Sequence, residues 1–192
     1  MNWIYGYLSD YSQNEYDDAR SKLSPSRRNR IERLSKEDDV RRSLLGEILL
    51  KKLLCKLGKN NEIIQCDSNG RPYLEGKGLY ISITHSGNMV ACAIDGQPIG
   101  IDAEMIRPIK LSLINRVCND AEAEYILPIF NRKAEKETID DDVVLEKFFS
   151  VWTSKEAIIK KSGKTIADIK SIDSSLFMKN AKRIDNYIIQ II

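Results

Sequence analysis

Residues 80–104 read YISITHSGNMVACAIDGQPIGIDAE. Turn-forming residues, Gly87 and the Asp95-Gly96 pair, divide this stretch into short apolar runs. Runs of this length and composition are typical of β-strands: YISIT (80–84), NMVACAID (88–95) and PIGIDAE (98–104). The stretch therefore predicts an antiparallel meander at the centre of the chain.

Helical patterns flank this predicted meander. Ser24-Pro25 is typical of a helix start, and a longer helix is predicted from Ser35 to about Gly58. Asn119 could cap a short helix, and VVLEKFFSVWTSKEAIIKKSG predicts a long helix ending at Gly163. The remaining β-type runs are NWIYGYLS near the start and SSLFMKN and NYIIQII near the end. These elements predict an α+β fold, and the two long helices permit two related lobes.

Composition excludes several classes of protein. A hydrophobic fraction of 42% and a charged fraction of 30% are ordinary for a globular domain. No apolar run approaches the roughly 18 residues that indicate a membrane span, and the start of the chain has no signal-peptide pattern. The four cysteines form no C-x-x-C pair and there is one histidine, so we expect no structural zinc site. We therefore expect reduced thiols and a cytoplasmic protein.

Charge is distributed unevenly along the chain. Residues 20–60 hold thirteen Lys or Arg against five Asp or Glu, whereas residues 135–146 hold six acids and one base. The acidic segment predicts a surface loop. The basic segment indicates an anionic partner, although a solvated helix face is the commoner explanation. A nucleic acid fits less well, because the segment lacks interleaved aromatic residues.

The last of the three β-type runs ends with two acidic residues. Asp102 and Glu104 are separated by Ala103, so strand alternation points both carboxylates to the same side. They repel each other unless a positive group lies between them. A hard cation such as Mg²⁺ would satisfy them, since it prefers oxygen ligands. For this pair alone, a strand end that becomes polar on reaching solvent is the more probable reading.

Two other sites favour phosphate chemistry. One is a turn that carries two hydroxyl groups and an imidazole, from Thr84, Ser86 and His85. These groups can form hydrogen bonds to phosphate oxygens. Arg71 lies between Gly70 and Pro72, where its guanidinium could bind phosphate through two hydrogen bonds. Taken singly, each has an ordinary alternative: a structural histidine and an exposed loop arginine.

A third site lies in WTSKEAIIKK. Glu156 and Lys160 are one helical turn apart, so they could be a surface ion pair beside a core tryptophan. The functional alternative makes Glu156 a third acid for the same cation, or a general base.

The order and spacing of GRPYL, ISITHSG, PIGIDAE and FFSVWTSKEAIIKKSGK resemble those of the Sfp-type 4'-phosphopantetheinyl transferases. The basic stretch SPSRRNRIERLSKEDDVRRSLLGEILL is similar to that family's N-terminal helix pair, so the resemblance covers nearly the whole chain. It implies two pseudo-symmetric lobes, each an antiparallel β-sheet packed with a long helix. The N-terminal lobe (1–100) would hold the basic helices and meander that bind coenzyme A. The C-terminal lobe (101–192) would hold the metal site and catalytic helix.

The resemblance also implies roles for particular residues. Mg²⁺ or Mn²⁺ would be bound by Asp102, Glu104 and Glu156. Glu156 would also be the catalytic base, with Lys160 as a second catalytic residue and Lys155 beside the phosphates. The remaining residues expected to bind coenzyme A are Arg27, Arg30, Arg42, Ser43, Arg71, Pro72, Thr84 and His85. Arg27, Arg30 and Arg71 replace the family's usual Lys, and Thr84 its usual Ser, which keeps the charge or hydroxyl.

The implied reaction moves the phosphopantetheine arm of coenzyme A to a serine hydroxyl of a carrier protein and releases adenosine 3',5'-bisphosphate. The carrier would serve fatty acid, polyketide or nonribosomal peptide synthesis, and the enzyme would be a monomer. The chain departs from the family in one respect, because family members usually continue beyond NYIIQII. Either the second lobe is shortened, or another chain completes it, or the sequence is a truncated form, and an unfinished sheet would expose an apolar edge strand. A coenzyme A-binding protein of the same fold with weak or lost transfer is therefore the alternative.

Overall fold

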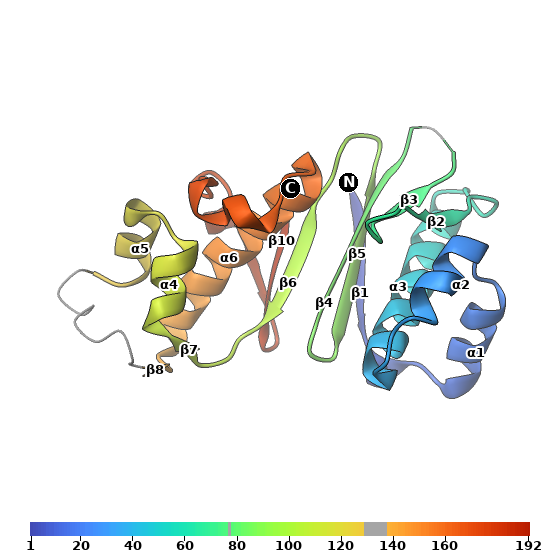
Figure 1. Ribbon diagram of the computed structural model, residues 1–192, viewed down its shortest axis with the longest axis horizontal. Coiled ribbons are helices and arrows are strands. Elements are labelled where there is room, and N and C mark those ends of the chain that lie inside the picture. The colour runs from blue at the N-terminus through green and yellow to red at the C-terminus, as the bar shows by residue number, and fades with distance from the viewer. Residues whose placement is uncertain (77, 129–137) are drawn as a thin grey trace. The chain divides into compact units, whose positions relative to one another are not determined.

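The computed structural model describes residues 1–76, 78–128 and 138–192. The chain divides into two compact units, unit 1 (Met1–Ile99) and unit 2 (Gly100–Ile192). Each unit contains a three-stranded antiparallel sheet and one long helix (Figure 1). The predicted α+β class is confirmed.

In unit 1 the sheet has the strand order β1-β5-β4, and β2 and β3 form a separate pair. Ser24 accepts a hydrogen bond from the backbone N–H of Arg27 at the start of α2, with Pro25 in the first turn, which confirms that helix start. The elements are β1 (Asn2–Tyr7), a 3₁₀ turn (Leu8–Asp10), α1 (Gln13–Ser21), α2 (Pro25–Ile31), α3 (Glu37–Lys56), β2 (Ile64–Cys66), β3 (Pro72–Leu74), β4 (Tyr80–Ser86) and β5 (Met89–Asp95).

The long helix α3 supplies much of the core of unit 1. Its leucine stripe is buried against β1 and β5, as the helical period of those leucines predicts. The helix begins at Glu37, two residues after the predicted Ser35, and Lys36 makes no capping bond through its side chain. Acidic residues in the first turn, beginning with Glu37, favour this start because they complement the helix dipole.

In unit 2 the sheet has the order β6-β10-β9, with α6 packed on β6 and β10. Asn119 caps α5, as predicted, and α6 ends at Gly163, which has a φ of 70°. The elements are β6 (Ile101–Met105), β7 (Ile109–Lys110), α4 (Leu111–Val117), α5 (Asp120–Ile126), β8 (Thr138–Ile139), α6 (Asp142–Ser162), 3₁₀ turns (Ile166–Ser171 and Met178–Asn180), β9 (Lys182–Ile184) and β10 (Tyr187–Ile191).

The predicted meander is wrong in its third strand. β4 and β5 pair as expected, but β6 pairs with β10 in the sheet of unit 2. Both edges of β5 are already occupied, by β1 and β4. Pro98 also lacks the N–H that a continuing ladder would need. PIGIDAE therefore leaves the first sheet and starts the second.

Two predictions near the C-terminus also need correction. SSLFMKN is not a strand, because the backbone and hydroxyl groups of Ser174 turn inward to bond Glu122. This sheet has two edge strands, β6 and β9, and the edge at β9 exposes Lys182 and Arg183 instead of an apolar surface. Of the predicted acidic surface loop, residues 129–137 lie outside the described residues, and Asp142 onward belongs to α6.

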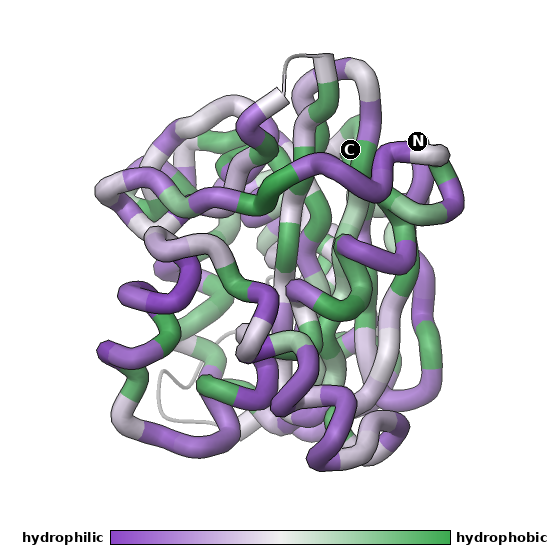
Figure 2. Tube along the Cα trace, turned by 90° about the vertical axis from the view of Figure 1, so that its right-hand side faces the viewer, coloured by the Kyte–Doolittle hydropathy of each residue, from purple (hydrophilic) through white to green (hydrophobic). Residues whose placement is uncertain are grey.

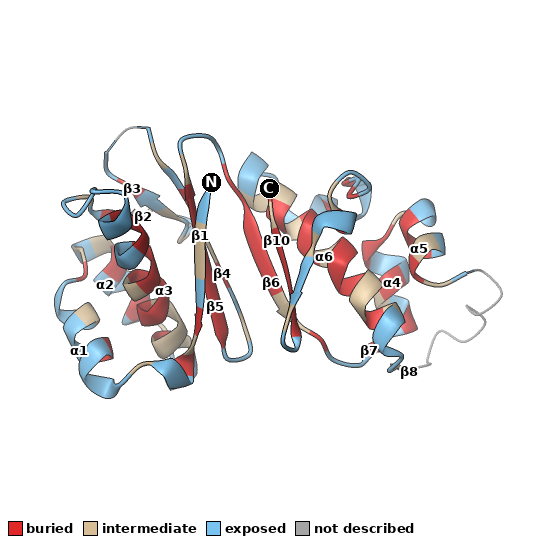
Figure 3. Cartoon of the chain, turned by 180° about the vertical axis from the view of Figure 1, so that it is seen from behind, coloured by how far each residue is buried: buried red, intermediate tan, exposed pale blue. Residues whose placement is uncertain are grey.

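Burial follows the amphipathic pattern of the chain. Hydrophilic and hydrophobic positions alternate along the helical segments (Figure 2). Nine residues of α3 and nine of α6 are buried, whereas α1 is mostly exposed (Figure 3). Within the described ranges, every helix is too short or too polar to cross a bilayer.

Candidate active site

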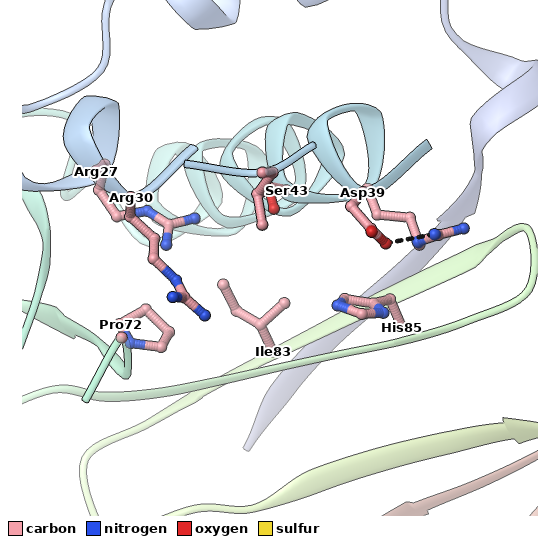
Figure 4. A pocket seen from close by; sticks show the side chains of 10 residues that line it. Arg27, Arg30, Asp39, Ser43, Pro72, Ile83 and His85 are labelled. Carbon is pink, nitrogen blue, oxygen red and sulfur yellow. Dashed lines mark hydrogen bonds and ion pairs between the residues drawn. The ribbon is translucent and has the colours of Figure 1, made fainter. Parts of the chain in front are cut away.

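A basic pocket lies in unit 1 between α2, α3, β3 and β4 (Figure 4). The cavity has a volume of about 360 Å³, within the range of small-molecule sites. It is lined by Arg27, Arg30, Leu34, Asp39, Arg42, Ser43, Gly70, Pro72, Ile83 and His85. Six of the eight residues of this unit expected to bind coenzyme A thus surround one cavity. Arg71 and Thr84 are not among its lining residues.

Strand alternation explains the position of Thr84. Ile83 and His85 line the pocket, so the side chain of Thr84 between them projects to the other face of β4, where it is buried. The turn before Pro72 has a different constraint. A Cβ on Gly70 would lie 3.0 Å from Cζ of Arg30, and the φ of Gly70 is 83°. A glycine here lets the Arg30 guanidinium lie directly against the turn.

Glu47 is a buried partner of the pocket that the sequence prediction missed. It lies on α3, and its Oε1 accepts a hydrogen bond from Nε of Arg27. Burial raises the pKa of the Glu47 carboxyl, and the Arg27 charge opposes that shift. An acid within the apolar run LLGEILL could have suggested a buried ion pair. The pair fixes Nε of Arg27 at the wall of the pocket.

Asp39 is the one acid that lines the pocket. Its Oδ1 accepts a hydrogen bond of 2.5 Å from Arg42, whose other terminal nitrogen donates to the Gly87 carbonyl at 3.0 Å (Figure 4). The hydrogen bond from Arg42 lowers the pKa of Asp39. Arg42 is therefore held in place by protein groups beside Ser43 and His85.

Unit 2 carries a cluster of three acids on β6 and α6. Asp102 is 2% exposed, and Nζ of Lys160 donates to its Oδ1 at 2.6 Å and to the Ile101 carbonyl at 3.1 Å. Glu104 lies 3.7 Å from the guanidinium of Arg107. Burial raises the pKa of Glu156 to about 7, helped by the negative charges of Asp102 and Glu104 and opposed by Lys160. The three carboxylates are thus close enough to repel one another.

Gly100 sets the contact between β6 and α6 beside this cluster. A Cβ on Gly100 would lie only 1.9 Å from the carbonyl oxygen of Ala157, the residue after Glu156. Any larger residue would push the start of the strand away from the helix. The glycine of PIGIDAE therefore brings Asp102 and Glu156 together.

The chemistry of these acids fits a divalent cation. In the part of the chain that the structure describes, no three His, Cys, Asp or Glu side chains form a ready set of metal ligands. Their oxygen donors are nonetheless the type that Mg²⁺ and Mn²⁺ prefer. Burial and, after it, the negative charges of Asp102 and Glu104 raise the pKa of Glu156, and a bound cation would relieve that repulsion.

Lys155 is not available to a phosphate in this structure, which corrects its predicted position. Its side chain is 0% exposed, and Nζ lies 2.7 Å from Oε2 of Glu122. It also donates to the carbonyls of Val117 and Ile169 at 2.9 and 3.0 Å. The adjacent Glu156 points to a different face of α6. Sequence spacing alone could not show which face of the helix is enclosed.

Comparisons with known proteins show which family the chain resembles. A model of the 4'-phosphopantetheinyl transferase superfamily matches residues 98–189, and a model of the 4'-phosphopantetheinyl transferase N-terminal region matches residues 10–97. The 4'-phosphopantetheinyl transferase Sfp of Bacillus subtilis is 31% identical over 170 residues, which cover 85% of this chain and 71% of Sfp. AcpT of Salmonella typhimurium, also a 4'-phosphopantetheinyl transferase, is 32% identical over 71% of this chain and 67% of its own length.

Two charged sites on an α+β fold, together with these similarities, define a transferase. The chain belongs to the 4'-phosphopantetheinyl transferase superfamily. Within that superfamily it is an Sfp-type enzyme, which transfers the phosphopantetheine group. The family uses coenzyme A as its substrate and acts on carrier proteins.

Proposed function

We propose that this transferase moves the phosphopantetheine arm of coenzyme A onto a serine hydroxyl of a carrier protein and releases adenosine 3',5'-bisphosphate. The basic pocket of unit 1 is the observation that carries this proposal. Coenzyme A ends in a diphosphate and a 3'-phosphate, and guanidinium groups such as those of Arg30 and Arg42 bind phosphate through paired hydrogen bonds. The carrier would belong to fatty acid, polyketide or nonribosomal peptide synthesis.

The proposed coenzyme A site consists of the predicted residues around this pocket: Arg27, Arg30, Arg42, Ser43, Pro72 and His85. Arg71 is included because its neighbours Gly70 and Pro72 line the cavity. A role for Thr84 finds no support in the pocket. With Lys155 enclosed, Lys160 is the lysine of α6 that remains for a catalytic role.

The acids of unit 2 would hold the metal and move the proton. Asp102, Glu104 and Glu156 would bind Mg²⁺ or Mn²⁺, which when bound stabilises negative charge on the phosphoryl group. Glu156 would take the proton of the serine hydroxyl, directly or through a water. Lys160 adds a positive charge beside Asp102.

The test measures the intact mass of several apo carrier proteins after incubation with coenzyme A, Mg²⁺ and the enzyme. We expect the mass of at least one carrier to rise by one phosphopantetheine group. Asp102→Asn should lower kcat/KM by about 1000-fold, with coenzyme A affinity and melting temperature nearly unchanged. The control is Glu146→Gln, an acid of α6 whose half-exposed side chain pairs with Arg183.

Two results would contradict the proposal. Wild-type turnover in Asp102→Asn would refute the metal assignment. Binding of coenzyme A without transfer to any carrier would instead support the non-transferring alternative. We further propose a cytoplasmic location, since the four cysteines are free, and a monomer, as the family resemblance implies. Light scattering tests the oligomeric state.

A further inference from the structure

Gln190 lies beside the acids of unit 2, although no sequence motif includes it. It is directly opposite Asp102 in the antiparallel pair of β10 and β6. Opposite residues of such a pair project their side chains to the same face of the sheet. Asp102 meets Lys160 of α6 on that face, and Ile188 on β10 packs into the core that includes α6. The amide of Gln190 therefore also lies beneath α6.

The Gln190 side chain is almost completely enclosed. It is 2% exposed, and its Nε2 donates to the Ile191 carbonyl at 3.2 Å. Its Oε1 is buried and accepts no hydrogen bond within the described residues. A buried carbonyl oxygen without a donor destabilises a fold, and native proteins contain few of them. An apolar side chain of similar shape would avoid this cost, so the amide needs another explanation.

The chemistry of the neighbouring site supplies that explanation. A divalent cation of the Mg²⁺ type usually keeps several waters, and each bound water donates hydrogen bonds to acceptors around it. Asp102, Glu104 and Glu156 already concentrate negative charge at the site. A neutral amide oxygen adds an acceptor without adding repulsion. Gln190 has such an oxygen, held on a strand whose register is fixed by its pairing with β6.

We propose that Gln190 is a positioning residue of the metal site, whose Oε1 accepts a hydrogen bond from a water bound to the cation held by Asp102, Glu104 and Glu156. This inference rests on the proposed function. No group among the described residues donates to this amide oxygen, and a water of the hydrated ion would supply a donor.

Three variants test the proposal, with Mn²⁺ as the probe. Gln190→Met keeps the approximate shape and removes the acceptor, whereas Gln190→Glu keeps an acceptor and adds charge. Ile188→Met is the matched control, because Ile188 lies on the same strand and face and has no polar group. Free Mn²⁺ is measured by electron paramagnetic resonance during titration, and melting temperature is measured without metal.

We expect Gln190→Met to weaken Mn²⁺ binding by about 10-fold, as is usual for groups that support metal ligands. Its metal-free melting temperature should equal or exceed that of the wild type, because an unsatisfied acceptor has been removed. In the transfer assay kcat should fall while KM for coenzyme A stays constant. Gln190→Glu should recover Mn²⁺ affinity but melt at a lower temperature without metal. Ile188→Met should bind Mn²⁺ like the wild type.

Either of two results would overturn the proposal. One is wild-type Mn²⁺ affinity in Gln190→Met. The other is a lowered metal-free melting temperature in Gln190→Met, which would show that the amide supports the sheet itself. Asp102→Asn separates these results from a failure of the proposed function, since it should lose Mn²⁺ binding whatever the role of Gln190. Retained binding in Asp102→Asn would instead refute the metal site.

Discussion

Units 1 and 2 have similar secondary structure, but their charged side chains are arranged differently. Each has a three-stranded antiparallel sheet and one long helix, of 20 residues in α3 and 21 in α6. Each long helix also contributes to a buried ion pair, Glu47 with Arg27 in unit 1 and Lys155 with Glu122 in unit 2.

The two ion pairs differ in what they support. Arg27 lines the basic pocket, so its pair forms part of the candidate binding site. Lys155 is enclosed, whereas the next residue, Glu156, faces the acid cluster. The ion pair of unit 1 thus includes a residue that lines the candidate binding site. The ion pair of unit 2 includes only a neighbour in sequence of a residue in the candidate metal site. Breaking each pair in turn is the sharpest test of that difference.

The largest effect is expected from Glu122→Ala. Lys155 would keep a buried charge without its counter-ion, which lowers the free energy of unfolding by about 4 kcal/mol. Urea unfolding followed by circular dichroism measures the change. The double variant Lys155→Met with Glu122→Leu should recover most of the loss, because both charges are then removed.

Glu47→Ala should cost less, about 2 kcal/mol. Arg27 lies at the wall of a cavity, so its freed guanidinium can turn toward water. The same urea measurement gives the comparison. Equal losses in Glu122→Ala and Glu47→Ala would show that the two pairs are equally enclosed and would remove the distinction drawn between the units.

The raised pKa of Glu156 predicts a pH dependence confined to unit 2. Between pH 4.5 and about 7 the native carboxyl binds more protons than the unfolded one, so the free energy of unfolding falls as pH rises. Without metal, Glu156→Gln should remove this slope and be more stable than wild type at pH 8 by about 2 kcal/mol. The variants should match near pH 4.5. Urea unfolding across this range is the measurement, and an unchanged slope would contradict the assignment.

The smallest expected effect concerns the pocket of unit 1. Arg30→Ala should weaken coenzyme A binding by about 10-fold, since it removes one partner of a phosphate. Arg28→Ala is the matched control, because Arg28 is exposed on the same helix but does not line this pocket. Isothermal titration calorimetry measures both affinities. Equal losses would indicate attraction by overall charge instead of a defined contact.

Local signals in the sequence predicted much of the fold. Helix caps at Ser24 and Asn119 and the end of α6 at Gly163 depend on neighbouring residues, so they could be predicted. The partner of PIGIDAE could not, because β10 lies far along the chain and β5 offers no free edge. Strand pairing depends on tertiary contacts that no short motif contains.

In the candidate site, too, some features could be predicted from local sequence and others depend on tertiary contacts. Alternation along β6 predicts that Asp102 and Glu104 project to one side of the strand, and in the structure Lys160 of α6 bonds Asp102. The enclosed position of Lys155 and the contribution of Gln190 depend on packing and register between distant segments. Motif spacing therefore found the charged residues, but it could not separate those facing the site from those that support it.

The register of the two sheets has a consequence for folding kinetics. Asn2 lies opposite Ile94 and Asp102 opposite Gln190, so each sheet joins strands roughly ninety residues apart. Loops of that length make pairing slow, because closure entropy is lost before contacts compensate it. During synthesis unit 1 has all its strands once Asp95 has emerged. β6 can pair only after β10 has been synthesised, so the sheet that carries Asp102 and Glu104 forms after unit 1 has all its strands.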